Sequence, residues 1–290
     1  MKRSIIPGLI GLLVPLCSCQ LWAQKQEATE KISKEFTLTT DAGRNTLALY
    51  NIDGSITVQG YNGSKVLVEA TKTIRADNAA TLELGKKEVQ LDFLQRNDSV
   101  VVYTKAPYDS RPNRNNRNGD HKELDYRYSF DYVVKVPYQM NLHVSTINNG
   151  TVLVQDVTGT MKAYNINGAV TLRNIKGTTT ARTINGNLEA SYAANPPGSS
   201  SYHTINGQIK VTYPPDLSAD VHFKTMHGEL YTDFPDVEQL PLQVTQKKQN
   251  AGSGTQYKLN RDAVVRVGKG GKDFRFETIN GDVTIKQQSK

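Results

Sequence analysis

Cysteine is almost missing from this chain. Of its 290 residues only two are cysteine, Cys17 and Cys19, and both lie in an N-terminal leader. The rest of the chain therefore cannot form a disulfide bond, and it has no thiolate with which to hold a metal.

Long apolar runs are also lacking. The longest, from Ile5 to Leu16, is shorter than a membrane span and is interrupted by Pro7 and Pro15. It follows two basic residues and ends before Ala23, which is typical of a secretory signal peptide. We predict a signal peptide over residues 1–23, export of the protein, and no transmembrane helix after signal removal.

Two mature N-termini remain open. Cleavage after Ala23 would release a free protein. The run Leu16, Cys17, Ser18 and Cys19 instead resembles a bacterial lipobox, whose last cysteine carries the lipid. Cys19 is thus a candidate lipidation site, and the predicted location is the periplasm or the cell surface, with outer-membrane anchoring in the lipidated case.

Catalytic and metal-binding motifs are absent from the sequence. The histidines, which do not have zincin spacing, are His121, His143, His203, His222 and His227. No Gly-x-Ser-x-Gly elbow occurs. The carboxylates of the repeats described below do not share one repeat position, whereas a glycosidase needs a pair at a set separation. We predict no enzyme activity, no cofactor and no metal.

The charge of the chain is mild. The net charge of +7 includes Lys2 and Arg3, which leave with the leader. The densest basic cluster, residues 111–120, is rich in Asn and lacks aromatic residues, so it predicts a loop and not a nucleic-acid site.

A four-residue unit, Thr-Ile-Asn-Gly, recurs instead. Its central isoleucines are Ile184, Ile205 and Ile279, and degenerate copies surround Ile52, Ile147, Ile166 and Met226. From Ile147 to Met226 the copies are about 18 to 21 residues apart, which is in the range of solenoid coils.

Each copy lies between two alternating patterns. Apolar residues fall four and six positions after the Ile, as in Val170 with Leu172 and Ile209 with Val211. This period of two indicates half-buried strands on either side of an Asn-Gly bend. A parallel β-helix or β-solenoid with coils of about 20 residues fits, and so does an antiparallel meander or sandwich.

The solenoid explains more, because stacked coils would place identical Thr and Asn residues in ladders about 4.8 Å apart. We therefore predict an all-β solenoid fold. The Asn and Gly residues are interpreted as structural turns without a ligand, and we expected positive φ there. These turn residues are Asn149, Gly150, Asn167, Gly168, Asn185, Gly186, Asn206, Gly207, His227, Gly228, Asn280 and Gly281.

The domain organisation follows from the pattern. Residues 24–35 are polar and predict a flexible tether, and residues 36–290 predict a single solenoid domain. A short helix is expected near residues 77–87, with Asp77 or Asn78 as its N-cap. A mobile loop is expected at about residues 106–124 and an excursion at about residues 235–275, after which the copy at Ile279 would close the solenoid as a cap.

Tyrosines near the strand ends offer a second interpretation. Tyr192, Tyr202, Tyr213 and Tyr231 could form an exposed sugar-stacking stripe, although alternation assigns Tyr213 to the core.

These features resemble a known family. The leader, the segment from Val136 to Tyr138 and the serial Ile-Asn-Gly units resemble the bacterial β-strand-repeat proteins called putative adhesins, which are related to the head GIN domain of autotransporter adhesins. The resemblance covers most of residues 40–288. It implies an extracytoplasmic β-helix-like domain, and it carries over no functional residue.

Our leading functional hypothesis is a non-enzymatic envelope protein, an adhesin whose solenoid surface binds a polysaccharide, a matrix component or another envelope protein. The alternative is a periplasmic accessory of an envelope-stress signalling system. A carbohydrate-active β-helix enzyme is a third candidate.

Overall fold

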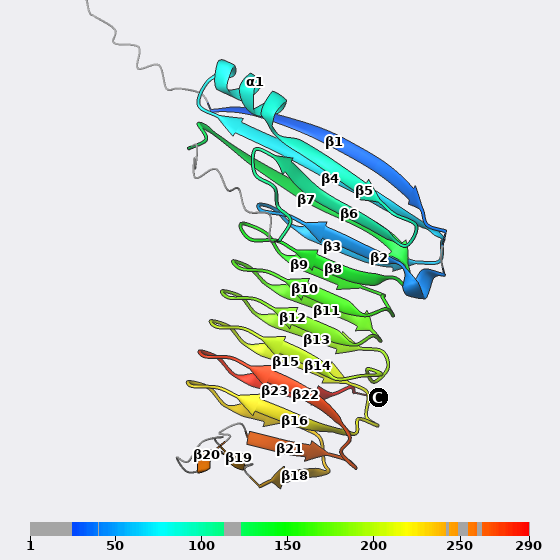
Figure 1. The fold of residues 1–290 in the computed structure, drawn as a ribbon, viewed down its shortest axis with the longest axis vertical. Coiled ribbons are helices and arrows are strands. Elements are labelled where there is room, and N and C mark those ends of the chain that lie inside the picture. Colours follow the sequence, from blue (N-terminus) through cyan, green and yellow to red (C-terminus); the bar gives the residue numbers. More distant parts are fainter. Residues whose placement is uncertain are drawn as a thin grey trace, which may run out of the picture.

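The structure consists almost entirely of β-strands. The computed structural model describes residues 25–39, 41–112, 123–241, 244–248, 255–259 and 263–289. Within them, a ten-stranded sheet A and an eleven-stranded sheet B face each other, and two further strands form a separate hairpin (Figure 1). The all-β prediction is confirmed. The predicted signal peptide and Cys19 lie outside the described residues.

Sheet A contains, in spatial order, β1 (Gln26–Thr37), β4 (Lys65–Ala76), β7 (Tyr126–Pro137), β3 (Ile56–Tyr61), β9 (Val152–Gln155), β11 (Val170–Ile175), β13 (Leu188–Tyr192), β15 (Ile209–Tyr213), β23 (Val283–Gln287) and β17 (Leu230–Thr232).

Sheet B contains, in spatial order, β18 (Val237–Leu240), β21 (Ala263–Val267), β16 (Ala219–Lys224), β22 (Lys272–Glu277), β14 (Ser200–His203), β12 (Thr179–Arg182), β10 (Met161–Tyr164), β8 (Asn141–Ser145), β2 (Thr46–Tyr50), β6 (Ser99–Ala106) and β5 (Gln90–Gln95). The hairpin is β19 (Val244–Lys248) with β20 (Thr255–Leu259), and the helices are a 3-10 turn (Ala42–Arg44) and α1 (Ala79–Glu88).

The chain alternates between the two sheets. We call a coil one strand of sheet B, the bend after it and the next strand of sheet A. Neighbouring coils pair in parallel, so that Ala163 of β10 lies between Val144 of β8 and Ala181 of β12. An antiparallel meander would require the opposite pairing. Among the described strands of sheets A and B, antiparallel pairing occurs only toward the ends of the stack, at β1, β4, β5, β18 and β21, which makes both sheets mixed.

The core lies between the two sheets. The apolar pairs that follow each bend are buried, as the alternation predicts: Ile56 and Val58, Val170 and Leu172, Leu188 and Ala190, Ile209 and Val211, and Val283 and Ile285. Burial of one such side chain contributes about 1.5–3 kcal/mol.

Tyrosines form part of this core. Tyr192, Tyr202 and Tyr213 are almost completely buried, and Tyr213 stacks between Tyr192 and Phe274 with ring centroids 4.9 and 5.3 Å apart. Tyr192 and Tyr202 share a hydrogen bond between their hydroxyl groups. The expected exposed stripe is therefore wrong for Tyr192 and Tyr202, whereas the assignment of Tyr213 to the core by alternation is confirmed; of the four tyrosines, only Tyr231 is exposed.

The last coil is not a cap. β22 and β23 lie between the coil of β14 and β15 and the coil of β16 and β17, as the red strands of Figure 1 show. The coil at Met226 thus leaves a gap one coil wide, and the final Thr-Ile-Asn-Gly copy fills it. Both edges of the inserted strands are then paired, which satisfies backbone groups that would otherwise stay open.

The other end is built in the same way. The coil of β2 and β3 lies between the coil of β6 and β7, which comes later in the chain, and the coil of β8 and β9. α1 and β1 then cover that end of the stack. Helix α1 begins after Asn78, whose side chain accepts a hydrogen bond from Thr81 N, close to the expected position.

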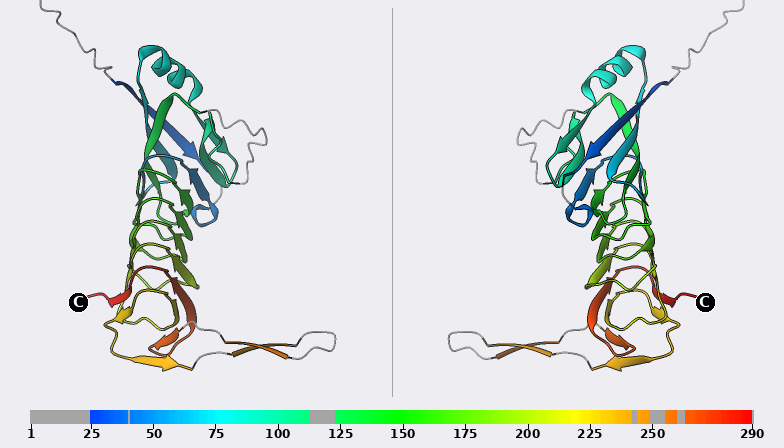
Figure 2. Two further views of the ribbon diagram at one scale, coloured as in Figure 1. Left: turned by 90° about the vertical axis from the view of Figure 1, so that its left-hand side faces the viewer. Right: turned by 90° about the vertical axis from the view of Figure 1, so that its right-hand side faces the viewer.

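Two boundaries differ from the sequence predictions. Residues 26–37, expected mostly as a tether, form β1, which pairs with β4 from Gln26 to Thr37. Ala28, Ile32 and Phe36 lie on the same face of β1 and pack against the core, which explains why this segment forms a strand and not a tether. The expected excursion contains β18, β21 and the hairpin of β19 and β20, which extends away from the stack (Figure 2). Most of the expected loop, residues 113–122, lies outside the described residues.

Candidate functional site

The bends form a continuous hydrogen-bonded row along one edge of the stack. Each Asn amide donates to the side-chain oxygen of the preceding Asn: Asn167 to Asn148, Asn185 to Asn167, Asn206 to Asn185 and Asn280 to Asn206, at 2.7–2.9 Å. His227 Nδ1 closes the row 3.1 Å from Asn280 Oδ1. Because the amides are aligned, the bonds reinforce one another and hold the coils in register.

A buried row of threonines runs beside the amides. Thr183 Oγ1 donates to Gly168 O at 2.9 Å, and Thr204 Oγ1 donates to Gly186 O at 3.0 Å. Thr146 and Thr278 make equivalent bonds to glycine carbonyls of neighbouring coils. The side chains that recur in the bends are therefore used within the fold.

The bend glycines are required for a reason other than the expected one. Of the predicted turn residues, only Asn149 and Gly281 have positive φ, at 51° and 151°. At Gly186 a Cβ atom would lie 2.2 Å from Gly168 O, and Gly150, Gly168, Gly207 and Gly228 face similar collisions. Close packing of successive coils, and not a left-handed turn, excludes a side chain. In the longer bend, Asn148 takes the ladder position and Asn149 is the extra residue.

Chemically distinctive side chains gather instead on the outer face of sheet B. Two columns of outward residues run across it in register. The first holds Tyr50, Ser145, Tyr164, Arg182, His203, Glu277 and Lys224, and the second holds Ala48, His143, Lys162, Thr180, Ser201, Arg275 and His222. The two columns correspond to the positions two and four residues before each central Ile or Met. The recurrence of Tyr, His and charged residues at these two positions was visible in the sequence, but our sequence analysis missed it.

One half of this face is aromatic. The His143 ring lies edge-on to Tyr50 and Tyr164, with centroids 5.2 and 5.4 Å away and interplanar angles of 78° and 89°. Tyr50 Oη is 3.2 Å from His143 Nδ1. Beyond Tyr50, the Arg111 guanidinium lies 3.9 Å above the ring of Tyr103. These contacts fix the rings as an ordered surface.

Burial shapes the protonation of this half. Burial, and secondly the nearby Lys162 charge, lower the pKa of His143. Burial also raises the pKa of Tyr50. At neutral pH the imidazole is therefore uncharged and the phenol protonated, and the two groups share one hydrogen bond between Tyr50 Oη and His143 Nδ1.

The other half consists of ion pairs. Lys224 Nζ lies 2.8 Å from Glu277, and His203 Nδ1 lies 3.4 Å from the same carboxylate. The hydrogen bond from Lys224, with a smaller contribution from His203, lowers the pKa of Glu277. His222 Nε2 lies 2.9 Å from Asp273. His203 and His227 lie on different faces, and the inserted last coil separates them.

Asp220 completes this half of the face. Arg266 Nε lies 2.8 Å from Asp220 Oδ1, and this bond lowers the pKa of the Asp220 carboxyl.

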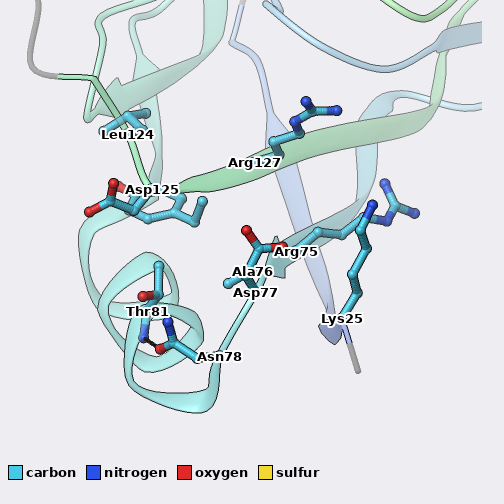
Figure 3. Close-up of a pocket in the computed structure, with 10 residues that line it drawn as sticks. Lys25, Arg75, Ala76, Asp77, Asn78, Thr81, Leu124, Asp125 and Arg127 are labelled. Carbon is cyan, nitrogen blue, oxygen red and sulfur yellow. Dashed lines mark hydrogen bonds between the residues drawn. The ribbon is translucent and has the colours of Figure 1, made fainter. Parts of the chain in front are cut away.

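A pocket at the α1 end of the molecule is a weaker candidate. It has a volume of about 740 Å³ and is lined by residues of β4, β7 and the start of α1 (Figure 3). Two of its polar side chains are already engaged: Asn78 caps α1, and Arg75 Nε donates to Glu27 Oε2 at 2.8 Å. Over the described part of the chain, no group of three His, Cys, Asp or Glu residues could hold a metal.

Comparisons with known proteins place the fold only loosely. No protein-family model and no curated protein matches the chain. Among solved structures it is similar to a putative cell adhesion protein of Clostridium sporogenes, with 10% identity, a TM-score of 0.41, and coverage of 91% of this chain and 100% of the other.

Two further structures are similar over comparable lengths. A putative adhesin of Bacteroides fragilis is 9% identical with a TM-score of 0.33, covering 89% of this chain and 97% of the other. A putative lipid binding protein of Parabacteroides distasonis is 7% identical with a TM-score of 0.27 over the same shares. Likenesses this distant carry no argument about function.

Proposed function

We propose that this protein is an exported, non-enzymatic binding protein of the bacterial cell envelope, an adhesin-like β-solenoid that presents the outer face of sheet B to its ligand. The ligand would be a polysaccharide, a matrix component or an envelope protein. The resemblance of the repeats to the putative-adhesin family, including the head GIN domain, is consistent with this role.

The concentration of functional side chains on one face carries the proposal. In four successive coils the outward residues of sheet A are Leu153, Gln155, Thr171, Arg173, Glu189, Ser191, Lys210 and Thr212. The outward residues of sheet B in the same coils are His143, Ser145, Lys162, Tyr164, Thr180, Arg182, Ser201 and His203. Only the second set combines aromatic rings and imidazoles with cations, as ligand-binding surfaces do.

The state of the carboxylates supports a non-enzymatic role. A glycosidase needs one carboxylic acid with a raised pKa beside a second carboxylate. On the outer face of sheet B, Glu277 and Asp220 are bonded to Lys224 and Arg266, and their pKa values are lowered instead. Neither is suited to donate a proton near neutral pH.

The leader supports export. Its basic start and short apolar core are typical of a signal peptide, and lipidation of Cys19 would anchor the chain to a membrane. Over the described residues, no helix is long and apolar enough to cross a membrane.

Protease shaving of intact cells that make a tagged full-length protein tests the location. Digestion on intact cells is expected for an adhesin that faces the exterior. Protection until the envelope is opened would place the protein in the periplasm. That result would favour the signalling accessory, whose membrane partner crosslinking would then identify.

A further inference from the structure

Four neighbouring strands of sheet B carry a compact group of side chains. The register places Tyr50, Ser145, Tyr164 and Arg182 in one row across β2, β8, β10 and β12. His143 and Lys162 are neighbours in the second row. Strands in a sheet are about 4.8 Å apart, so Tyr50 and Tyr164 lie about 9.6 Å from each other along the stack, with His143 contacting both rings.

The charge of this group is uncompensated. The outward positions of these four strands, all within the described residues, hold Lys162 and Arg182 and no carboxylate. Both cations are exposed. By contrast, Arg111 at the edge of the same face is bound to Asp109 through two of its nitrogens. Lys162 and Arg182 are therefore available to an anionic partner.

Hydrogen-bonding capacity is also left over. Tyr50 Oη engages His143 Nδ1, which leaves Nε2 of the uncharged imidazole outside that bond, beside two aromatic rings, to donate or accept a hydrogen bond according to its tautomer. Half-buried rings, a neutral imidazole nitrogen and unpaired cations together suit a ligand with an apolar face, hydroxyl groups and a negative charge. A sugar ring that bears a carboxylate combines all three, and an Arg fork can bind that carboxylate through two bonds.

We infer that Tyr50, His143 and Tyr164, together with Lys162 and Arg182, form a binding subsite for a carboxylate-bearing sugar unit of a linear acidic polysaccharide. This inference rests on the proposed function and specifies its ligand. A polymer lying along the stack would meet Tyr50 and Tyr164 in succession, with a carboxylate on Arg182. No bond is made or broken.

Calorimetric titration of the full-length protein with oligogalacturonate tests the subsite, and its fully methyl-esterified form is the matched uncharged ligand. We expect binding that weakens at least about tenfold on esterification and on raising the salt concentration. Tyr164→Ala and Arg182→Gln should each weaken it by about tenfold, whereas Tyr164→Phe should retain it because the ring remains.

Two variants of sheet A are the controls. Arg173→Gln removes an exposed Arg from the outer face of β11, and Tyr231→Ala removes an exposed ring from β17. Both should bind like the unmodified protein. Arg182 lies on the surface, so the Arg182→Gln variant should have the same melting temperature as the unmodified protein. A loss of binding in this variant would then come from the lost contact with the ligand and not from unfolding.

The outcomes separate the two proposals. Equal binding of the ester, or full binding by Arg182→Gln, would overturn the subsite. Failure to bind oligogalacturonate while another glycan or an envelope protein binds through sheet B would overturn the subsite and leave the proposed function standing. Binding that is lost only in the sheet A variants would overturn both.

Discussion

Sheets A and B are made by the same coils, yet their outer faces differ. The inward positions of both sheets must be apolar because they form the shared core, as Val170 on sheet A and Ala163 on sheet B illustrate. Outward positions carry no such constraint. In the four coils from β8 to β15, sheet A uses this freedom for Thr, Ser, Gln and charged residues, whereas sheet B collects tyrosines and histidines beside its cations. The residues that differ between the two faces are therefore those that packing does not dictate.

The difference between the two outer faces depends on coils that stack in a fixed register. Substitution of a bend glycine should disturb this stacking most strongly. In Gly186→Ala the new Cβ would meet Gly168 O at 2.2 Å, and two backbones would have to separate. We expect a loss of about 3 kcal/mol in the free energy of unfolding, and distortion of both faces. Urea denaturation would measure it.

Gly43→Ala is the matched control, because the nearest atom to its Cβ would be Gln139 Oε1 at 3.9 Å. It should change stability by less than about 0.5 kcal/mol. Similar midpoints for the two variants would contradict the close-packing explanation.

A smaller effect is expected from removing one rung of the amide row. Asn185→Ala deletes one hydrogen bond to Asn167 and one from Asn206, which should cost about 1–2 kcal/mol. Asn185→Asp keeps an acceptor for Asn206 but loses the donor to Asn167, so it should fall between Ala and the unmodified protein. Urea midpoints that rank Asp with or below Ala would show that the row does not contribute as described.

The charged half of sheet B makes a pH prediction. The folded-state pKa of Glu277 lies below its reference value of 4.5, so its contribution to stability is fully present above pH 4.5 and is lost as pH falls through the folded pKa. Lys224→Met removes the main cause and should raise the pKa of Glu277. Carboxyl chemical shifts in an NMR titration would report it.

Lys210→Met is the comparison on sheet A, since Lys210 pairs with Glu189. It should leave the Glu277 titration unchanged. A pKa of Glu277 that does not move in Lys224→Met would show that the Lys224 contact is not its cause.

The smallest effect is expected in the aromatic half of sheet B, on the pKa of His143. Burial is the main cause that lowers the pKa of His143 below 6.5, and Lys162 is the second. The folded protein thus resists protonation at His143, and the contribution of this group to stability declines as pH falls below 6.5. Lys162→Gln should raise the pKa of His143 only slightly, as imidazole NMR shifts would measure. Full restoration to 6.5 would make charge, not burial, the dominant cause.

The repeat pattern predicted much of the fold because its signals are local. Alternation located the buried pairs such as Ile209 and Val211, and Asn78 was one of the two residues expected to cap the helix near residue 79. The Asn row also followed from the sequence, because a residue that recurs once per coil must stack on itself. The columns on the outer face of sheet B were not predicted, because the prediction rested on the Ile-Asn-Gly bend and not on the residues two and four positions before it.

Other features could not be predicted from local signals. The tyrosines near the strand ends looked like a surface stripe, but Tyr192 and Tyr202 turn inward, where Tyr192 stacks on Tyr213 of the next coil and Tyr202 stacks on Phe276 of the inserted coil. The polar residues 26–35 were expected to be free, yet they pair along the whole of β4. In both cases a distant segment provides the surface that orders the residues.

The sequence by itself determined the strand period, the bends, the inward and outward positions and the candidate leader, because each depends on residues close together in the chain. Only the tertiary structure decided the order of the coils. The coil at Ile279 comes last in the chain, yet it lies one place nearer the middle of the stack than the coil at Met226. The coil at Ile52 comes first, yet it lies one place nearer the middle than the coil of β6 and β7. Near-identical units have nearly the same strand edges, so the local sequence does not specify which unit pairs with which. The arrangement is selected by the pairing of strand edges over the whole stack.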